Sequence, residues 1–239
     1  MHSIKIFADG ADLAKMREMA AREYVAGFTT NPSLMRKSGV TDYRAFAREA
    51  LAIAGGRPVS FEVLADDFSE MRRQALVING WGAPLHVKIP ITDTRGQSSA
   101  PLIRELSELG VSVNVTAVFT TSQVVAAAGA LAVAPDVRPV RPIISVFAGR
   151  IADAGQDAFR VVGGHRNIVS ARCSCAQLLW ASPRQVYDAV LAQRAGCDII
   201  TMTPELIAKL PLLGKNLEEF SRETVEMFYR DAQGARYAL

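Results

Sequence analysis

The sequence predicts a closed (β/α)8 barrel, in which eight parallel strands form a ring surrounded by helices. Strand-like and helix-like runs alternate along the chain, which is typical of parallel βαβ units. Eight strand-like runs fit within 239 residues, close to the roughly 250 residues that such barrels usually need. No GxGxxG turn follows the first run, so the alternative, an open doubly wound sheet, is less well supported.

The strand-like runs are short and rich in β-branched and other apolar residues. They cover residues 4–9, 25–30, 58–65, 85–91, 111–119, 142–149, 177–182 and 198–203. Between the early runs lie amphipathic stretches of helical character, at 11–22, 43–54 and 67–78. No Pro/Gly/Ser-rich linker and no internal repeat divides the chain, so we expect one domain over residues 1–239.

An extra helix is predicted at about 216–232, after the eighth unit. Its apolar residues Leu217, Phe220, Val225 and Phe228 fall near one helical face. We expect this face either to cover an end of the barrel or to dock on a neighbouring subunit.

The composition excludes several classes of protein. There is no apolar run of about 18 residues and no signal-peptide layout at the start, so we expect a cytoplasmic protein without a membrane partner. The net charge of +3 arises from scattered residues and gives no reason to expect nucleic acid. The cysteines, at 173, 175 and 197, form no CxxC pair, so neither disulfides nor a metal site are expected.

Strand alternation places a lysine inside the barrel. Val87 and Ile89 fall on the phase that faces the helices, so Lys88 between them faces the interior. Burying an ammonium costs hydration, so Lys88 either forms a buried ion pair or acts as a nucleophilic amine. An apolar interior favours the neutral amine, whereas nearby carboxylates favour the charged form.

The same alternation turns further polar side chains inward, mostly near the C-terminal ends of the strands. With the lysine, this set comprises Asp9, Thr29, Asn31, Glu62, Lys88, Asn114 and Thr116. Barrel interiors are normally packed with Val, Ile and Leu, and barrel active sites lie at the C-terminal ends of the strands. A substrate site is therefore predicted, with Asp9 and Glu62 as proton-transfer groups beside Lys88.

These strands carry motifs that resemble those of the transaldolase family, in its short branch that includes the fructose-6-phosphate aldolases. In the family's order they are FADGAD (7–12), GFTTNPSL (27–34), VSFEVLADD (59–67), LHVKIPIT (85–92), VNVTAVF (113–119), SVFAGRIAD (145–153), LWAS (179–182) and AGCDIITMTP (195–204). They span almost the whole chain, and TTNPS followed by VKIP is highly specific.

The resemblance implies a metal-free, cofactor-free class I mechanism. By position, Lys88 would form a Schiff base with a ketose carbonyl, and Asp9 would deprotonate the C4 hydroxyl during C–C cleavage. Glu62 and Thr116 would position the water that transfers protons during Schiff-base formation.

The resemblance also implies the substrate contacts. The side chains matched to the dihydroxyacetone unit are Thr29, Asn31, Asn114 and Ser145, and those matched to the phosphate are Arg150, Ser182 and Arg184. A planar guanidinium suits phosphate because it gives two parallel charge-assisted hydrogen bonds.

Two positions bear on the reaction catalysed. Glu62 stands where the fructose-6-phosphate aldolases tend to carry glutamine, and Phe147 stands where they carry tyrosine. A tyrosine hydroxyl could help water release free dihydroxyacetone, and phenylalanine lacks that group. We therefore expect transfer of a dihydroxyacetone unit from fructose 6-phosphate or sedoheptulose 7-phosphate to an aldose phosphate, either in the pentose phosphate pathway or in a specialised sugar pathway. The alternatives are an aldolase that releases free dihydroxyacetone and a non-catalytic sugar-phosphate-binding relative.

Quaternary structure and one divergent segment complete these expectations. Relatives of the short branch commonly form ring-based decamers, which implies a homo-oligomer. Residues 158–176 depart from the family pattern, because Gly163 and Gly164 each disfavour a helix by about 1 kcal/mol. This segment bears on the placement of Ser182 and Arg184.

Three isolated residues have competing interpretations. His86 is expected to be a core histidine, and Trp180 is expected to point inward beside the phosphate site. Arg95, in the loop 93–99, either reaches the substrate or belongs to an ordinary polar loop.

Overall fold

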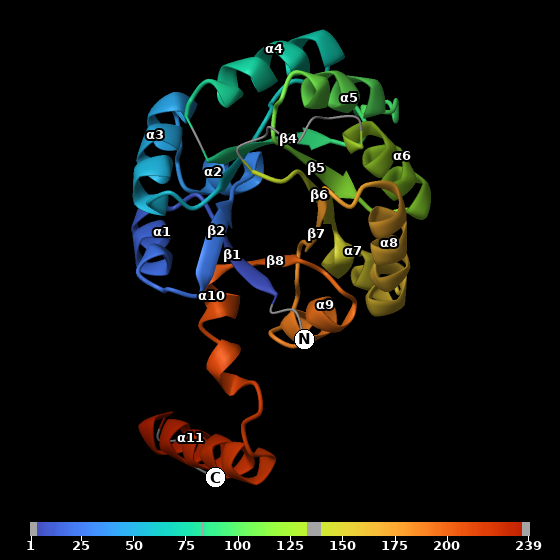
Figure 1. Ribbon diagram of the computed structural model, residues 1–239. Coiled ribbons are helices and arrows are strands. Elements are labelled where there is room, and N and C mark those ends of the chain that lie inside the picture. Colours follow the sequence, from blue (N-terminus) through green and yellow to red (C-terminus); the bar gives the residue numbers. More distant parts are fainter. Residues whose placement is uncertain (1–3, 83, 133–139, 236–239) are drawn as a thin grey trace.

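The computed structural model, which describes residues 4–82, 84–132 and 140–235, contains a closed barrel of parallel strands (Figure 1). Each strand pairs with the next along the chain, and the last pairs with the first. The strands are β1 (Lys5–Asp9), β2 (Val25–Thr29), β3 (Val59–Glu62), β4 (Leu85–Pro90), β5 (Val113–Val118), β6 (Ile143–Val146), β7 (Gln177–Trp180) and β8 (Ile199–Met202). The predicted (β/α)8 barrel is therefore confirmed.

Helices surround these strands, and one further helix, α11 (Leu217–Ala235), lies outside the ring (Figure 1). The others are α1 (Leu13–Ala20), α2 (Pro32–Lys37), α3 (Tyr43–Ala54), α4 (Phe68–Asn79), α5 (Ala100–Glu108), α6 (Thr121–Leu131), α7 (Ala148–Asp153), α8 (Ala158–Arg172), α9 (Asp188–Arg194) and α10 (Pro204–Ile207). Side chains cap several first turns: Asp42 accepts from the backbone N–H of Ala45 at the start of α3. No helix in the described ranges is long and apolar enough to cross a bilayer.

Apolar side chains pack in two layers. The larger layer lies between the strands and the helices, and the smaller one fills part of the barrel interior with Phe7, Ile143, Leu179, Ala181 and Ile199. Trp180 belongs to the larger layer, so the prediction that it points inward was wrong. Strand alternation explains the difference, because the neighbours of Trp180 occupy the inner phase of β7.

The segment with two adjacent glycines forms a regular helix, α8, so the expectation that these glycines disfavour a long helix was wrong. Buried residues Ala158, Val162, His165 and Val169 make a stripe along one face. The Asp157 side chain caps the first turn by accepting from the N–H of Arg160 at 3.2 Å. Tertiary packing of this stripe outweighs the low helix propensity of glycine.

Replacing Gly164 by alanine should raise the free energy of unfolding by about 1 kcal/mol, because alanine has the higher helix propensity. Gly164 is exposed, and a Cβ there would meet no atom within 4 Å. Gly155→Ala is the control: it has equally open surroundings, but its φ of 78° is left-handed, so alanine should be destabilising. Urea unfolding measures both variants, and a less stable Gly164→Ala protein would contradict the prediction.

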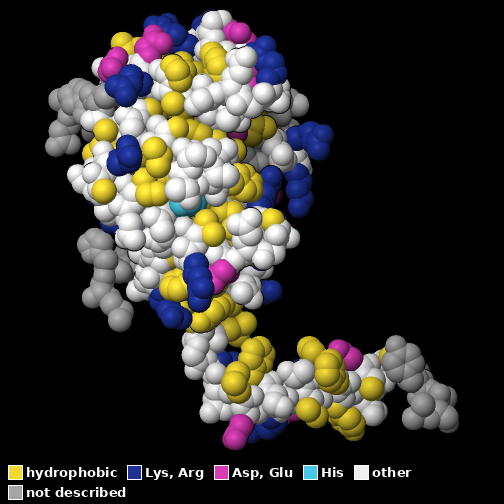
Figure 2. Space-filling view, turned by 90° about the vertical axis from the view of Figure 1, so that its right-hand side faces the viewer, with side chains coloured by type: hydrophobic (Ala, Val, Ile, Leu, Met, Phe, Trp, Pro, Cys, Tyr) yellow, Lys and Arg dark blue, Asp and Glu magenta, His cyan; other side chains and the backbone are white. Residues whose placement is uncertain are grey.

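The C-terminal helix α11 begins within one residue of its predicted start and stands away from the barrel (Figure 1). Asn216 caps it by accepting from the N–H of Glu218 at 2.9 Å. Figure 2 shows apolar side chains along this projecting helix, where Leu217 and Phe228 are 80% and 62% exposed. Within one chain, α11 therefore does not cover an end of the barrel.

Candidate active site

The main cavity lies at the C-terminal ends of the strands and has a volume of about 510 Å³. Every side chain predicted for the site lines it, namely Asp9, Thr29, Asn31, Glu62, Lys88, Asn114, Thr116, Ser145, Phe147, Arg150, Ser182 and Arg184. Barrel closure brings these residues together from positions far apart in the sequence, at the end of the barrel where active sites are usually found.

Lys88 and Glu62 lie side by side in the cavity, since the register of β3 and β4 pairs them directly. The Lys88 side chain is 7% exposed, and its Nζ lies 2.9 Å from Oε2 of Glu62. Nζ also donates a hydrogen bond of 2.8 Å to the backbone oxygen of Thr30. The amine therefore has a fixed position and a carboxylate in direct contact that can exchange a proton with it.

Asp9, the last residue of β1, is held by a chain of hydroxyl groups. Thr29 Oγ1 donates to Asp9 Oδ1 at 2.7 Å and lies 2.5 Å from Thr201 Oγ1. Since a hydroxyl has one proton to donate, Thr201 is the donor to Thr29. Burial raises the pKa of Asp9 above its ordinary value, against the opposing effect of the Lys88 charge. A raised pKa makes the ionised carboxylate a stronger base, which suits a proton-transfer role.

Thr201 was missing from the predicted set, although it lines the cavity. Residues 198–203 are predicted to form a strand, and the alternation of side chains along this strand places Thr201 on the inner face.

Two amide side chains line the cavity, Asn114 from β5 and Asn31 from the start of α2. Asn114 is oriented by Ser145, whose Oγ donates to its Oδ1 at 2.7 Å, and by Ser60, whose Oγ accepts from its Nδ2 at 3.2 Å. The Oδ1 of Asn31 caps α2 by accepting from the N–H of Leu34 at 3.0 Å, which leaves its amide nitrogen for a ligand.

The buried hydroxyl of Thr116 also lines the cavity and has no hydrogen-bond partner within the described part of the chain. A buried hydroxyl normally has a partner, so this group is suited to a substrate atom or a bound water.

Two arginines line the cavity, Arg150 from α7 and Arg184 from the loop after β7, and they differ in their partners. The guanidinium of Arg150 lies over the ring of Phe147, at 5.2 Å, and forms no ion pair with any described carboxylate. Arg184 is already engaged, because its Nε donates to Asp153 Oδ2 at 2.9 Å. Of the two, Arg150 is the one free to bind an anion.

The backbone beside these arginines is tightly constrained. Ser182 has a left-handed φ of 60°, which is strained for a residue with a side chain. A Cβ on Gly149 would lie 1.5 Å from the backbone oxygen of Ser182, so only glycine fits there. The first turn of α7 and the loop after β7 are thus packed against each other, and the glycine pair of α8 does not displace Ser182 from the cavity.

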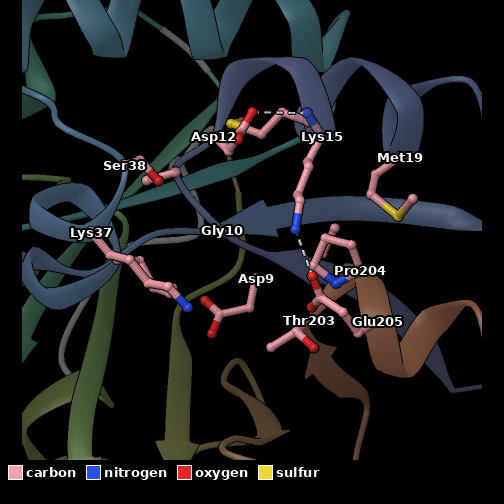
Figure 3. A pocket seen from close by; sticks show the side chains of 14 residues that line it. Asp9, Gly10, Asp12, Lys15, Met19, Lys37, Ser38, Thr203, Pro204 and Glu205 are labelled. Carbon is pink, nitrogen blue, oxygen red and sulfur yellow. Dashed lines mark hydrogen bonds and ion pairs between the residues drawn. The ribbon is translucent and has the colours of Figure 1, made fainter.

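A smaller pocket of about 220 Å³ adjoins the main cavity and shares Asp9, Leu34 and Thr203 with it. Figure 3 shows the ammonium end of Lys37 directed toward Asp9. Lys15 forms an ion pair with Glu205, with Nζ 2.6 Å from Oε1. The hydrogen bond from Lys15 lowers the pKa of Glu205 to about 2. This pocket lacks Lys88, so the larger cavity is the candidate active site.

Two of the isolated residues lie outside this chemistry. His86 is buried, with its Nε2 at 2.9 Å from the backbone oxygen of Arg141, and burial lowers its pKa to about 4. Arg95 pairs with Asp93 at 2.9 Å and does not line the cavity. The described residues contain no group of three or more His, Cys, Asp or Glu side chains arranged to hold a metal.

Comparison with known proteins places the chain in a family. Residues 6–239 match the family described as Transaldolase/Fructose-6-phosphate aldolase. A probable transaldolase of Chelativorans sp. (strain BNC1) is 34% identical over 220 residues, which are 91% of this chain and 94% of that protein. A probable transaldolase of Methanococcus maripaludis (strain C7) is 32% identical over 220 residues, covering 91% and 95%.

Solved structures agree on the fold. A 2,3-dimethylmalate lyase superposes with a TM-score of 0.57 at 13% identity, covering 97% of this chain and 84% of that one. A monomeric dihydrodipicolinate synthase variant gives a TM-score of 0.59 at 12% identity, covering 98% and 80%. At this identity the likeness extends to the barrel fold alone.

The fold and the comparisons together define a (β/α)8-barrel enzyme of the aldolase type. The chain belongs to the transaldolase/fructose-6-phosphate aldolase family.

Proposed function

We propose that this protein is a transaldolase that transfers a dihydroxyacetone unit from a ketose phosphate to an aldose phosphate through a Schiff base on Lys88. The observation that carries the proposal is the buried Lys88 amine, 2.9 Å from a Glu62 oxygen, in a cavity also lined by Asp9. A nucleophilic amine flanked by two carboxylates has the groups that both steps of aldol transfer require.

The proposed reaction divides the proton transfers between the two carboxylates. The neutral Lys88 amine adds to the ketose C2 carbonyl, and Glu62, with a water held by Thr116, moves the protons that convert the adduct to an iminium ion and water. Asp9 then removes the C4 hydroxyl proton, the C3–C4 bond breaks, and the electron pair flows into the iminium to give an enamine. The aldehyde departs, an acceptor aldehyde adds by the reverse steps, and hydrolysis frees the product.

Trapping with borohydride tests this mechanism. Incubation with fructose 6-phosphate and borohydride should give a covalent adduct on Lys88, because reduction fixes the iminium as a secondary amine. Peptide mass spectrometry locates the adduct, and trapping on a different lysine would refute the mechanism. Sugar-phosphate binding without any adduct would instead support the non-catalytic alternative.

The choice of transfer over cleavage rests on the side chains that surround the enamine. Phe147 packs against Phe119, with ring centroids 5.6 Å apart, and lines the cavity without offering a hydroxyl to activate water. We therefore expect turnover of fructose 6-phosphate to need erythrose 4-phosphate as acceptor. Release of dihydroxyacetone at full rate without an acceptor would favour the aldolase alternative.

Arg150 is proposed as the main phosphate ligand. Arg150→Gln should raise KM for fructose 6-phosphate about tenfold or more, since a charge-assisted hydrogen bond is worth about 1.5–3 kcal/mol. Arg184→Gln is the matched control, expected to change KM less because Asp153 already holds its guanidinium. Steady-state kinetics of the two variants test the ranking, and equal effects on KM would contradict it.

We further propose a homo-oligomer, in which the projecting helix α11 docks on a neighbouring subunit. Leu217, Val225 and Phe228 are at least 62% exposed within one chain, and water contact with such side chains is unfavourable. A decamer is the expected assembly from the family resemblance. Light scattering gives the mass of the full chain in solution, and a monomer would contradict this proposal.

A further inference from the structure

The hydrogen-bond ladder between β2 and β3 is interrupted beside the reactive lysine. The N–H of Thr30 donates to the oxygen of Ser60 at 3.1 Å. The alternation of a parallel ladder would next join the N–H of Glu62 to the oxygen of Thr30. Instead, Glu62 donates to the hydroxyl of Tyr43 at 2.8 Å, and the Thr30 oxygen accepts from Lys88 Nζ at 2.8 Å.

The Tyr43 hydroxyl holds both backbone groups of Glu62. It accepts from the N–H of Glu62 and donates to its carbonyl oxygen at 2.9 Å. Tyr43 is the first residue of α3, and its ring makes edge contacts with Phe61 and Trp81, at centroid distances of 6.2 and 5.0 Å. Burial raises the pKa of this phenol, so it remains a neutral group that can both donate and accept.

We propose that Tyr43 is a positioning residue for the Lys88–Glu62 pair. By binding the Glu62 backbone, its hydroxyl replaces the expected ladder bond and leaves the Thr30 carbonyl free to accept from Lys88. Tyr43 does not line the cavity, so it acts through these two residues and does not contact substrate. The inference rests on the proposed function only in taking Lys88 as the reactive amine.

Without the Tyr43 hydroxyl, the shortest repair is the missing ladder bond. In Tyr43→Phe, the N–H of Glu62 loses its acceptor and can turn to the oxygen of Thr30, since a buried N–H without a partner is costly. The Lys88 ammonium would then lose that oxygen. Because this bond engages one of the protons on Nζ and fixes the position of the amine, we expect Lys88 to react faster with an electrophile once the bond is lost.

Competitive labelling measures this change without any substrate. Acetic anhydride acylates amines that have a free electron pair, and mass spectrometry reports the labelling rate at Lys88 relative to that at the other lysines. In Tyr43→Phe the labelling rate of Lys88 relative to the other lysines, measured at one fixed pH, should rise about tenfold, the factor that loss of a hydrogen bond worth about 1.5 kcal/mol to a charged group implies. Trp81→Phe is the matched control, because it alters the packing around Tyr43 and keeps the hydroxyl.

Steady-state kinetics provide the second measurement. Tyr43→Phe should lower kcat about tenfold or more, since a displaced nucleophile loses its alignment with the carbonyl. KM for fructose 6-phosphate should stay within about twofold, because the substrate contacts are untouched. Trp81→Phe should retain both the labelling rate of Lys88 and kcat even if its melting temperature falls. Identical labelling rates for wild type and Tyr43→Phe would overturn the proposal.

A measurement on the wild-type protein covers the case in which Tyr43→Phe does not fold. Hydrogen–deuterium exchange at the Glu62 amide should be slow, because the Tyr43 hydroxyl holds it. Fast exchange there would overturn the proposal without any variant. Failure of borohydride trapping at Lys88 would refute the proposed function, whereas the labelling and exchange results test Tyr43 independently of turnover.

Discussion

Lys88→Met should lower kcat about 10⁴-fold or more and abolish the borohydride-trapped adduct, because removal of a covalent nucleophile eliminates the catalysed route. Methionine has a similar length and fills the space of the lysine stem, so the barrel should still close. Coupled assay of fructose 6-phosphate and erythrose 4-phosphate measures the loss, and mass spectrometry measures the adduct.

The variant should also lose stability, because Glu62 and the Thr30 oxygen both lose their partner. Removing one member of a buried pair costs about 3–5 kcal/mol, but Glu62 opens on the cavity and can be hydrated, so we expect the lower end. Lys88→Arg is the control that separates the two effects. It keeps the positive charge but cannot form a Schiff base, so it should be inactive yet more stable than Lys88→Met.

A second control addresses the neighbouring pocket. Lys37 also directs its ammonium toward Asp9 (Figure 3), but it is exposed and has no Glu62 beside it. Lys37→Met should therefore keep a trapped adduct on Lys88. An adduct that persisted in Lys88→Met and disappeared in Lys37→Met would place the reaction in the smaller pocket.

The inward row of β4 was predictable because strand alternation is local. Val87 and Ile89 identify the outer phase, and Lys88 must then face the opposite way. The same reasoning gave the wrong direction for Trp180, because β7 (Gln177–Trp180) has apolar residues in both phases and the outer phase could not be identified. Sequence periodicity thus reports a side chain's direction only where the apolar phase is unambiguous.

Contacts between distant segments were not predictable. The Tyr43 hydroxyl reaches Glu62 because α3 packs across the end of β3, and no periodicity in 43–54 indicates which strand atoms it meets. The engagement of Arg184 by Asp153 likewise depends on how α7 meets the loop after β7. Motif matching alone treated Arg150 and Arg184 as similar, and the structure separates them by their partners.

Helix α8 shows why the two glycines were a poor guide to the structure of this segment. Two adjacent glycines lower the intrinsic propensity by about 2 kcal/mol together, but both lie off the buried stripe that docks the helix on the barrel. Burial of side chains such as Val162 and Val169 offsets that cost at about 1.5–3 kcal/mol each. Propensity decided little here because the helix is stabilised by its packing.

Asp9→Asn should separate the two halves of the reaction. The amide cannot take the C4 hydroxyl proton, so kcat should fall about 10²–10⁴-fold, the usual contribution of a positioned acid or base. The amide oxygen of the new side chain can still accept from Thr29, and Lys88 with Glu62 is left in place, so the adduct with fructose 6-phosphate should still be trapped. Loss of the adduct as well would mean that Asp9 acts before C–C cleavage.

The same variant should gain stability at neutral pH. Burial raises the pKa of Asp9 above its ordinary value of 3.8, so the folded state binds this proton more tightly than the unfolded chain. The contribution of Asp9 to stability is therefore fully present below 3.8 and is lost as pH rises through the folded-state value. Asparagine has no such titration, so the melting temperature of Asp9→Asn relative to wild type should rise as the pH increases above 3.8.

Asp93→Asn provides a control of opposite sign. Burial acts to raise the pKa of the Asp93 carboxyl. Hydrogen bonds from the backbone N–H groups of Gln97 and Arg95, and from the Arg95 side chain, outweigh burial and lower this pKa. Its contribution to stability is present above the ordinary value of 3.8 and is lost as pH falls through the folded-state value. Asp93→Asn should thus be more destabilising at pH 7 than in acid. The melting-temperature difference between variant and wild type could instead change in the same direction with pH for both variants. That result would show that the folded protein stabilises Asp9 as a carboxylate. Burial would then not explain how Asp9 acts as a base.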